Sequence, residues 1–322
     1  MITSEVTEMQ NLDAKRFCSG NYWRKIGRHI LQHKTYYFLM LPALIYVIIF
    51  CYRPMYGLQI AFKDYKGYLG IEGSKWVGLK HFKNFFNGVY FWRLLRNTLL
   101  LSFYAMIAGF PLPIILALLL NEINPKVRKV SQTILYAPHF ISTVVLVGII
   151  NTMFSPSIGI VNKAIEAFGG EAHYFLADPG AFRHLYVWSG VWSGTGWGTV
   201  IYVAALAGVS PELHEAATID GASRLQRIWH INLPSILPTI IILLIMRVGN
   251  LVSVGYEKVY LLQNPLNQEV SEVISTYVYK HGIVQPNYSY STAIGLFNNV
   301  INILLLCIAN TISRKVSETS LF

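Results

Sequence analysis

Six polar or aromatic side chains stand within long apolar stretches of this 322-residue sequence, where they could bind a polar molecule. Arginine and asparagine offer directional hydrogen bonds, and an arginine can also hold a carboxylate through two parallel N–H groups. The apolar face of a tryptophan ring suits the C–H face of a sugar ring. The combination therefore predicts recognition of a sugar, and the six residues are Trp192, Trp197, Arg247, Asn250, Asn298 and Asn302.

These side chains are expected near the middle of a membrane. Arg247 lies twelve residues after Ser235, which is about 18 Å along a helix, and the apolar core of a bilayer is about 30 Å thick. A charge at that depth normally faces a cavity or a partner. Two interpretations stay open. The residues line a solute path, or Arg247 pairs with a carboxylate of a partner subunit while the asparagines join helices and the tryptophans pack in the core or the interface.

No arrangement of residues for catalysis stands out. The phosphate-binding pattern GxxxxGK[ST] is absent from the sequence, so no ATP site of that kind is expected. His214 and Glu215 begin an HExxH pattern, but Thr218 occupies the position of the second histidine, which excludes that zinc site. The three cysteines are isolated, so neither a zinc knuckle nor a disulfide framework is supported. The chain is predicted to be no enzyme and to hold no cofactor or metal.

The composition is typical of a membrane protein. Hydrophobic residues make up 53% of the chain and charged residues 13%, about half of the roughly 25% usual in soluble domains. The net charge of +10 indicates basic cytoplasmic segments in a chain that crosses the lipid bilayer, and no nucleic-acid motif accompanies it. The polar start of the chain and the lack of a small-residue cleavage site after the first apolar run predict a retained anchor.

An all-α membrane protein with six transmembrane helices is predicted. Basic residues in the N-terminal tail, in two loops and at the C-terminus place both termini in the cytoplasm. Segment 53–96 carries eight basic residues, yet the number of spans requires it to lie outside. The division is a cytoplasmic tail 1–35, a transmembrane domain 36–313 and a cytoplasmic tail 314–322. The expected spans are residues 36–52, 97–120, 133–154, 185–209, 235–262 and 290–313.

Local signals refine these spans. Pro111 and Pro113 predict a kink in the second span, and Pro138-His139 interrupts the third, with the histidine interpreted as a packing residue. Aromatic residues within 82–92 predict short helices at the membrane interface. Glycines recur at four-residue spacing in the fourth span, which predicts close helix packing. They are Gly190, Gly194 and Gly198.

A polar, amphipathic insert, residues 211–238, separates the fourth and fifth spans. Pro211 suits the start of a helix, and Asp220-Gly221 is a turn signal. A second short helix is expected after the turn, with Pro234 closing the insert and opening the next apolar run. Hydrocarbon cannot satisfy the polar groups of such a segment, so the insert must lie in water or against another protein.

This insert resembles the EAA signature of ABC-importer permeases. It contains the run Glu215-Ala216-Ala217, and Gly221 is separated by nine residues from Ile231. In that family the loop docks on a separate ATPase subunit and couples nucleotide-driven motion to the transmembrane helices. The resemblance implies this role for the loop 210–234, and its motif positions here are Glu215, Ala216, Ala217, Asp220, Gly221, Trp229, Ile231, Leu233 and Pro234.

The resemblance covers nearly the whole chain after residue 35. FKDY, GLKHF and the last span resemble sugar permeases, and GYEKVYLL and TYVY resemble the subgroup for pectin- or alginate-derived oligosaccharides. It implies the type I ABC importer permease fold, with a cytoplasmic coupling-helix loop, in a bacterial cell membrane. It also implies a second permease subunit, often a different chain, and two ATPase subunits that bind ATP and Mg. An extracytoplasmic binding protein would deliver the oligosaccharide, an acidic one in this subgroup.

Three alternatives stay open. The same machine could import peptides, amino acids or ions, because the loop alone does not define the solute. An ion-coupled secondary carrier would need a buried acid and internal repeats, and the one acid found within the expected spans is Glu257, near an outer end. A membrane-anchored structural protein would leave the insert unexplained.

Overall fold

The structure is a computed structural model, and it describes residues 32–317 and 320–321. The chain divides into two compact units, residues 1–59 and 60–322. The expected cytoplasmic tail 1–35 lies outside the described residues except for residues 32–35. In the described part of the chain the regular structure is helical, as predicted, except for one two-stranded hairpin.

The first unit is one apolar helix over its described residues. It comprises α3 (Lys34–Val47), a π-helical turn (Ile48–Tyr52), α4 (Arg53–Met55) and a 3-10 segment (Tyr56–Phe62) whose last residues belong to the second unit. The helix over residues 34–62 is long and apolar enough to cross a membrane. The expected first span, 36–52, is therefore part of a longer helix.

The second unit opens with a small hairpin. Strands β1 (Lys63–Lys66) and β2 (Ser74–Trp76) pair antiparallel around α5 (Gly70–Gly73). The hairpin was not predicted, because its strands are short and rich in lysine. Helix α6 (Lys80–Phe86) follows and confirms one of the short helices expected in the aromatic segment, whereas Phe91 and Trp92 begin a long helix. Its Phe85 is buried against neighbouring aromatic rings, including that of Phe297.

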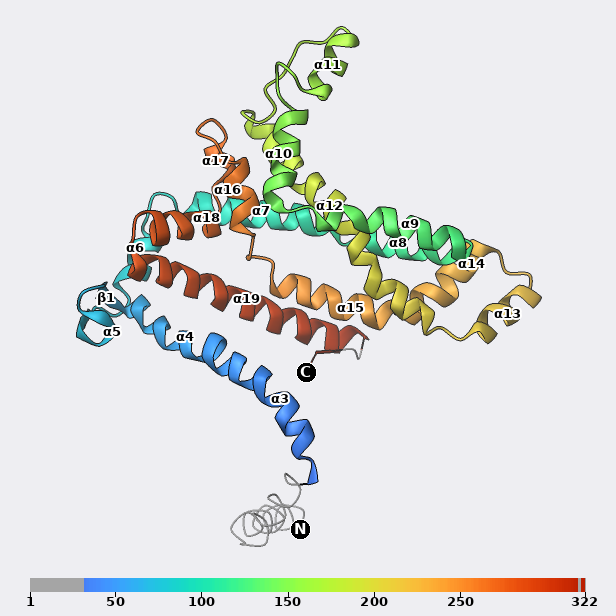
Figure 1. Cartoon of the computed structure of the whole chain (residues 1–322), viewed down its shortest axis with the longest axis horizontal. Helices are drawn as coiled ribbons and strands as arrows, with labels where there is room; N and C mark the ends of the chain where they lie inside the picture. The colour runs from blue at the N-terminus through green and yellow to red at the C-terminus, as the bar shows by residue number, and fades with distance from the viewer. Residues whose placement is uncertain (1–31, 318–319, 322) are drawn as a thin grey trace. The chain divides into compact units, whose positions relative to one another are not determined.

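Four helices of the described chain are long and apolar enough to span a membrane, over residues 34–62, 91–122, 224–249 and 288–315. The second consists of α7 (Phe91–Gly109) and α8 (Pro111–Glu122), which meet at Phe110. The short break in the assigned helix falls directly before Pro111, while residues 91–122 still run as one long helix, so the kink expected from the prolines stays a prediction. The last of the four is α19 (Tyr288–Ser317), which packs along α15 (Figure 1).

The expected third span is a bent pair. Helix α9 (Pro125–Tyr136) continues as a 3-10 turn (Ala137–Phe140) and meets α10 (Thr143–Met153) at an angle of 93°. The predicted interruption at Pro138-His139 is confirmed as a sharp bend. The Oγ atom of Ser142 accepts a hydrogen bond from the backbone N–H of Val145 (3.3 Å), which starts α10 in its new direction.

Helix α12 (Pro179–Ala207) contains nearly all of the expected fourth span and contacts α7, α8 and α15. Its glycines, serines and threonines make it less apolar than the four helices above. Close packing occurs at Gly196, which lies directly against the backbone carbonyl of Leu135. Gly198 is tight against Pro113, as the repeat predicts, but the expectation is wrong for Gly194, where a Cβ would have nothing within 4 Å.

The insert forms α13 (Pro211–Ile219) and α14 (Arg224–Arg227). Helix α14 continues through a π-helical turn (Ile228–Asn232) into α15 (Leu233–Gly249), so residues 224–249 form one helix. The expectation that Pro234 closes the insert is wrong. This proline is the second residue of α15 and follows the π-helical turn directly, so the helix passes through it without ending.

The expected fifth span, 235–262, also proves too long. Helix α15 ends at Gly249, and residues 250–255 connect it to a separate helix, α16 (Tyr256–Leu262). Helix α16 packs against α10 and α12. The remaining helices are α11 (Ile160–Ala167), α17 (Gln268–Ser271) and α18 (Ile274–Tyr279), the last followed by a π-helical turn (Lys280–Val284).

A buried acid joins the α17–α18 region to α7. The side chain of Glu272 is 6% exposed and pairs with Arg93 (Nη2 to Oε2, 2.9 Å) and Lys280 (Nζ to Oε1, 3.0 Å). Asn97 donates hydrogen bonds to the backbone carbonyls of Glu269 and Glu272. The start of α7 and the α17–α18 region are therefore joined by polar contacts.

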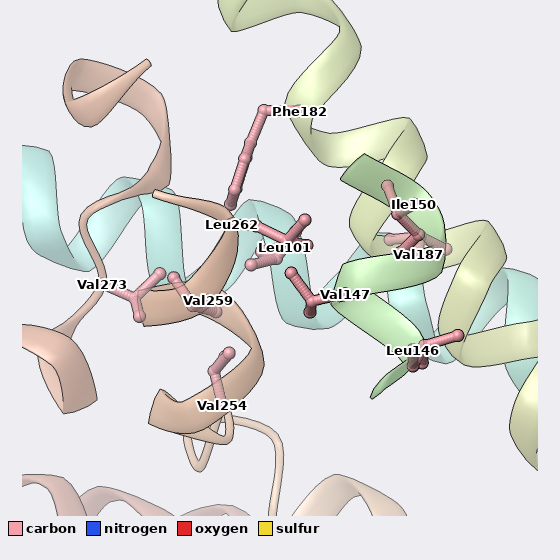
Figure 2. Close-up of a cluster of buried hydrophobic side chains, with 10 residues drawn as sticks. All are labelled: Leu101, Leu146, Val147, Ile150, Phe182, Val187, Val254, Val259, Leu262 and Val273. Atoms are coloured by element: carbon pink, nitrogen blue, oxygen red, sulfur yellow. The ribbon is translucent and has the colours of Figure 1, made fainter. Parts of the chain in front are cut away.

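Apolar side chains from α7, α10, α12 and α16 meet in a buried cluster (Figure 2). Within a bilayer such a cluster is stabilised by close van der Waals packing and not by the exclusion of water. The cluster holds the short helix α16 beside the long helix α12. Its members are Leu101, Leu146, Val147, Ile150, Phe182, Val187, Val254, Val259, Leu262 and Val273.

Candidate functional site

Arg247 of α15 lines a cavity of about 450 Å³ whose other walls come mainly from α12, with further residues from α7, α8, α10 and α16. Pro113 of α8 and His139 of the bend also line it. The glycines of the expected repeat also line this cavity. Because they carry no side chains, they leave space beside α12 in addition to permitting helix contact. They are Gly190, Gly194 and Gly198.

The Arg247 guanidinium approaches α7 at Gly109, where a Cβ would lie 3.4 Å from its Nη2 atom. Among the residues that the structure describes, Arg247 belongs to no ion pair. Together with Asn250 it also lines two smaller cavities, of about 240 and 380 Å³. Arg247 and Asn250 are thus brought together, with the positive charge free to meet an anion.

A second cation, Lys258, lines the 450 Å³ cavity and was missed by the sequence analysis. Its Nζ atom donates a hydrogen bond to the Tyr186 carbonyl oxygen (2.7 Å) and lies 4.7 Å from the centre of the Tyr186 ring. In the sequence the residue appears at the outer end of an apolar run. The break at residues 250–255 and the packing of α16 against α12 bring it to the cavity.

The two tryptophans lie elsewhere on α12. Trp192 lines a nearly apolar cavity of about 710 Å³ between α10 and α12. Trp197 stacks on His139, with ring centroids 4.8 Å apart and ring planes within 1°. Neither tryptophan lines the cavity at Arg247, although Trp197 supports the His139 ring that does. His139 therefore has the packing contact expected of it and also faces the cavity.

The two asparagines of α19 lie outside the cavities at Arg247, and one of them joins α19 to the connection after α15. Asn302 is buried, its Oδ1 accepts a hydrogen bond from the Val252 N–H (3.1 Å), and its Nδ2 donates to Ser253 Oγ (2.7 Å). It therefore fixes the connection that follows Asn250. The Oδ1 atom of Asn298 is buried without a hydrogen-bond partner. Neither asparagine lines the Arg247 cavities, and for Asn302 the contacts fit the interpretation of a residue that joins helices.

Helices α13 and α14 of the insert form a helical hairpin, distinct from the β-hairpin of β1 and β2, and contacts between them hold the two helices together. Gly221 has φ +77°, a conformation that glycine adopts without strain, and its N–H donates to the Thr218 carbonyl oxygen (3.1 Å). The side chains of Ser223 and Gln226 cap the second helix reciprocally. Arg227 then donates from Nη1 to Thr218 Oγ1 (2.8 Å), which joins the two helices directly.

Apolar side chains project from this polar hairpin. Ile219 is 87% exposed, and Leu225 and Trp229 are each more than half exposed. Exposed apolar groups within a polar segment indicate a surface for another protein. The motif positions differ in exposure. Glu215, Asp220 and Pro234 are exposed, whereas Ile231 and Leu233 are half-buried.

The base of the hairpin is anchored to a second helix. Asn232 is fully buried and donates from Nδ2 to Glu122 Oε1 at the end of α8 (3.3 Å). The hairpin thus has a free apolar surface at one end and a fixed connection to two long helices at the other.

Comparison with known proteins gives concordant results. Residues 109–318 match the family model described as "Binding-protein-dependent transport system inner membrane component". The chain is 48% identical to Protein LplB of Bacillus subtilis over 90% of this chain and 92% of that protein. It is 44% identical to the polygalacturonan/rhamnogalacturonan transport system permease protein YteP of the same organism, over 91% and 92% of the two chains.

A solved structure matches as well. It is a chain of a bacterial ABC transporter involved in the import of the acidic polysaccharide alginate, with a TM-score of 0.83, 40% identity, and coverage of 91% of this chain and 99% of that chain. The fold is therefore that of the helical type I ABC importer permeases. The extent of these matches and the hairpin that follows α12 lead to one conclusion: the chain belongs to the family of binding-protein-dependent transport system inner membrane components, the permease subunits of ABC importers.

Proposed function

We propose that this permease subunit imports acidic oligosaccharides, with Arg247 binding a substrate carboxylate on the way through. The observation that carries the proposal is a cation with no ion-pair partner, within the described chain, on the wall of a 450 Å³ cavity. A guanidinium group binds a carboxylate through two parallel hydrogen bonds. Asn250 adds an amide beside it that suits a sugar hydroxyl.

The relatives support an acidic sugar over a neutral one. Polygalacturonan is a polymer of a uronic acid, and the transporter of the solved structure is described as importing the acidic polysaccharide alginate. Each of these polymers carries carboxylates along its length. A peptide or amino acid importer would explain the hairpin equally well, but not the likeness of the whole chain to these carbohydrate permeases.

The membrane topology that fits is the one expected from the sequence, six spans with both termini in the cytoplasm. Four apolar helices and the bent pair α9–α10 supply five of them, and α12 supplies the sixth. Helix α12 tolerates its small polar residues because it is packed among α7, α8 and α15. The transmembrane domain would then be 36–313, between the cytoplasmic tails 1–35 and 314–322.

ATP and Mg are proposed to bind on two separate ATPase subunits, not on this chain. The hairpin would dock on one of them through Glu215, Asp220 and the exposed apolar side chains. A second permease subunit would complete the path, and an extracytoplasmic binding protein would deliver the sugar. A related transporter has been solved in complex with an alginate pentasaccharide-bound periplasmic protein, which supports this assembly.

ATPase stimulation tests the proposal. The complex purified through this chain is reconstituted with its binding protein and offered uronic-acid oligomers or carboxyl-reduced oligomers of the same length. We expect stimulation by the acidic oligomers and little by the neutral ones. Stimulation by the neutral oligomers alone would refute the acidic substrate while leaving the family assignment intact.

A further inference from the structure

Two cations on different helices face one cavity. Arg247 reaches it from the end of α15, and Lys258 reaches it from α16. Tyr186 of α12 also lines this cavity and contacts Lys258 through its carbonyl oxygen and its ring. The two charges therefore act on one volume, although eleven positions separate them in the sequence.

Neither charge is neutralised within the described chain. The ion pairs found there involve other residues, and none of the side chains that line the cavity is acidic. Lys258 is half-buried, and its neighbour Glu257 is exposed and forms no ion pair among the described residues. A carbonyl oxygen and an aromatic face compensate an ammonium group only partly. The cavity is therefore positive and suited to an anion.

Small residues leave space beside each cation. A Cβ at Gly190 would lie 3.1 Å from Lys258 Nζ, closer than an ordinary contact, and a Cβ at Gly109 would lie 3.4 Å from Arg247 Nη2. A side chain at position 190 would therefore press on the ammonium group of Lys258, which is the flexible end of its side chain. The space at position 190 therefore affects where the Lys258 ammonium group can lie.

We propose that Lys258 binds a second carboxylate of the substrate, so that the cavity selects oligosaccharides with acidic groups on more than one sugar ring. This inference rests on the acidic substrate proposed above. In a uronic-acid oligomer the carboxylates recur on every ring, so cations on separate helices can hold different rings of one chain. An ammonium group is a compact point charge, which suits a carboxylate whose orientation changes as the sugar moves.

The test compares Lys258→Met with Lys258→Arg in the reconstituted complex. Lys258→Met should lower stimulation by a uronic-acid trimer about tenfold, the loss of a hydrogen bond to a charged group. It should alter stimulation by a trimer with a single uronic acid much less, and Lys258→Arg should retain most of the response. Lys163→Met removes an exposed lysine of α11 and serves as the matched control.

The possible outcomes separate the two proposals. If the wild-type complex ignores acidic oligomers, the acidic substrate itself is refuted. If the wild type responds and Lys258→Met keeps the wild-type preference for the multiply acidic trimer, only the role of Lys258 is refuted. If Lys258→Met fails to assemble, Lys258→Gln provides the second test, because it removes the positive charge while keeping a polar side chain at the cavity. An unchanged preference for the multiply acidic trimer in that variant would overturn the inference.

Discussion

The backbone of Gly196 in α12 lies directly against the carbonyl oxygen of Leu135 in α9. No Cβ fits between them, so the helices must separate if position 196 carries a side chain. Gly196→Ala should therefore destabilise the protein by about 1–3 kcal/mol, the usual cost of overpacking. Gly194→Ala, two residues away, meets nothing within 4 Å and is the matched control. Equal thermal midpoints for the two variants in detergent would contradict this close contact.

The ion pairs of Glu272 should stabilise the α17–α18 region. Glu272→Gln leaves Arg93 and Lys280 without their buried carboxylate, and we expect a loss of about 1–3 kcal/mol, because both cations are partly exposed. The loss can be read from the thermal midpoint and from faster proteolysis within residues 263–289. Glu257→Gln, at an exposed position, should leave both unchanged. Similar proteolysis rates in the two variants would count against the role of this cluster.

Arg247 should discriminate between acidic and neutral sugars. Arg247→Met removes the bidentate partner of a carboxylate and should lower stimulation by acidic oligomers about tenfold or more. Stimulation by carboxyl-reduced oligomers, where it is measurable, should change little. Arg247→Lys should keep part of the stimulation by acidic oligomers, because the positive charge remains. It should not keep all of it, because the paired N–H donors of the guanidinium group are lost. An equal loss for acidic and neutral oligomers would assign Arg247 a structural role.

The hairpin should transmit force only while its two helices are joined. Arg227→Met removes the hydrogen bond from Arg227 to Thr218, worth about 0.5–1.5 kcal/mol, and should lower transport relative to ATP hydrolysis by about twofold to tenfold. Arg224→Met removes the same charge from an exposed position in the same turn. Transport and ATPase activity measured together in proteoliposomes provide the ratio, which should fall for Arg227→Met alone.

Local signals in the sequence were sufficient for the hairpin. The helix start at Pro211 and the Asp220-Gly221 turn lie where expected, because each depends on a few neighbouring residues. Arg247 was also found, since a charge in a long apolar run needs a polar environment. The partner subunits were predicted from the family signature alone, because no local pattern in the chain specifies them.

The features that were not predicted from the sequence depend on packing between distant segments. Lys258 faces the cavity only because residues 250–255 break the helix and α16 packs against α12. Gly196 is a contact point only because α9 crosses α12 there, and the spacing of Gly190, Gly194 and Gly198 pointed to other positions. Periodicity describes one helix at a time, so it does not reveal which neighbour a residue will meet.

The helix over residues 224–249 is continuous from the hairpin to Arg247, with a π-helical turn near its start. Its first turn belongs to the hairpin, and Arg247 lies in its last turn, about 34 Å away at 1.5 Å per residue. Such a helix works as a lever. A tilt of about 10° imposed at the hairpin would move the other end by about 6 Å, as much as one helical turn rises. A push from outside the membrane domain could thus reposition the guanidinium group within the cavity without a relay of intermediate contacts.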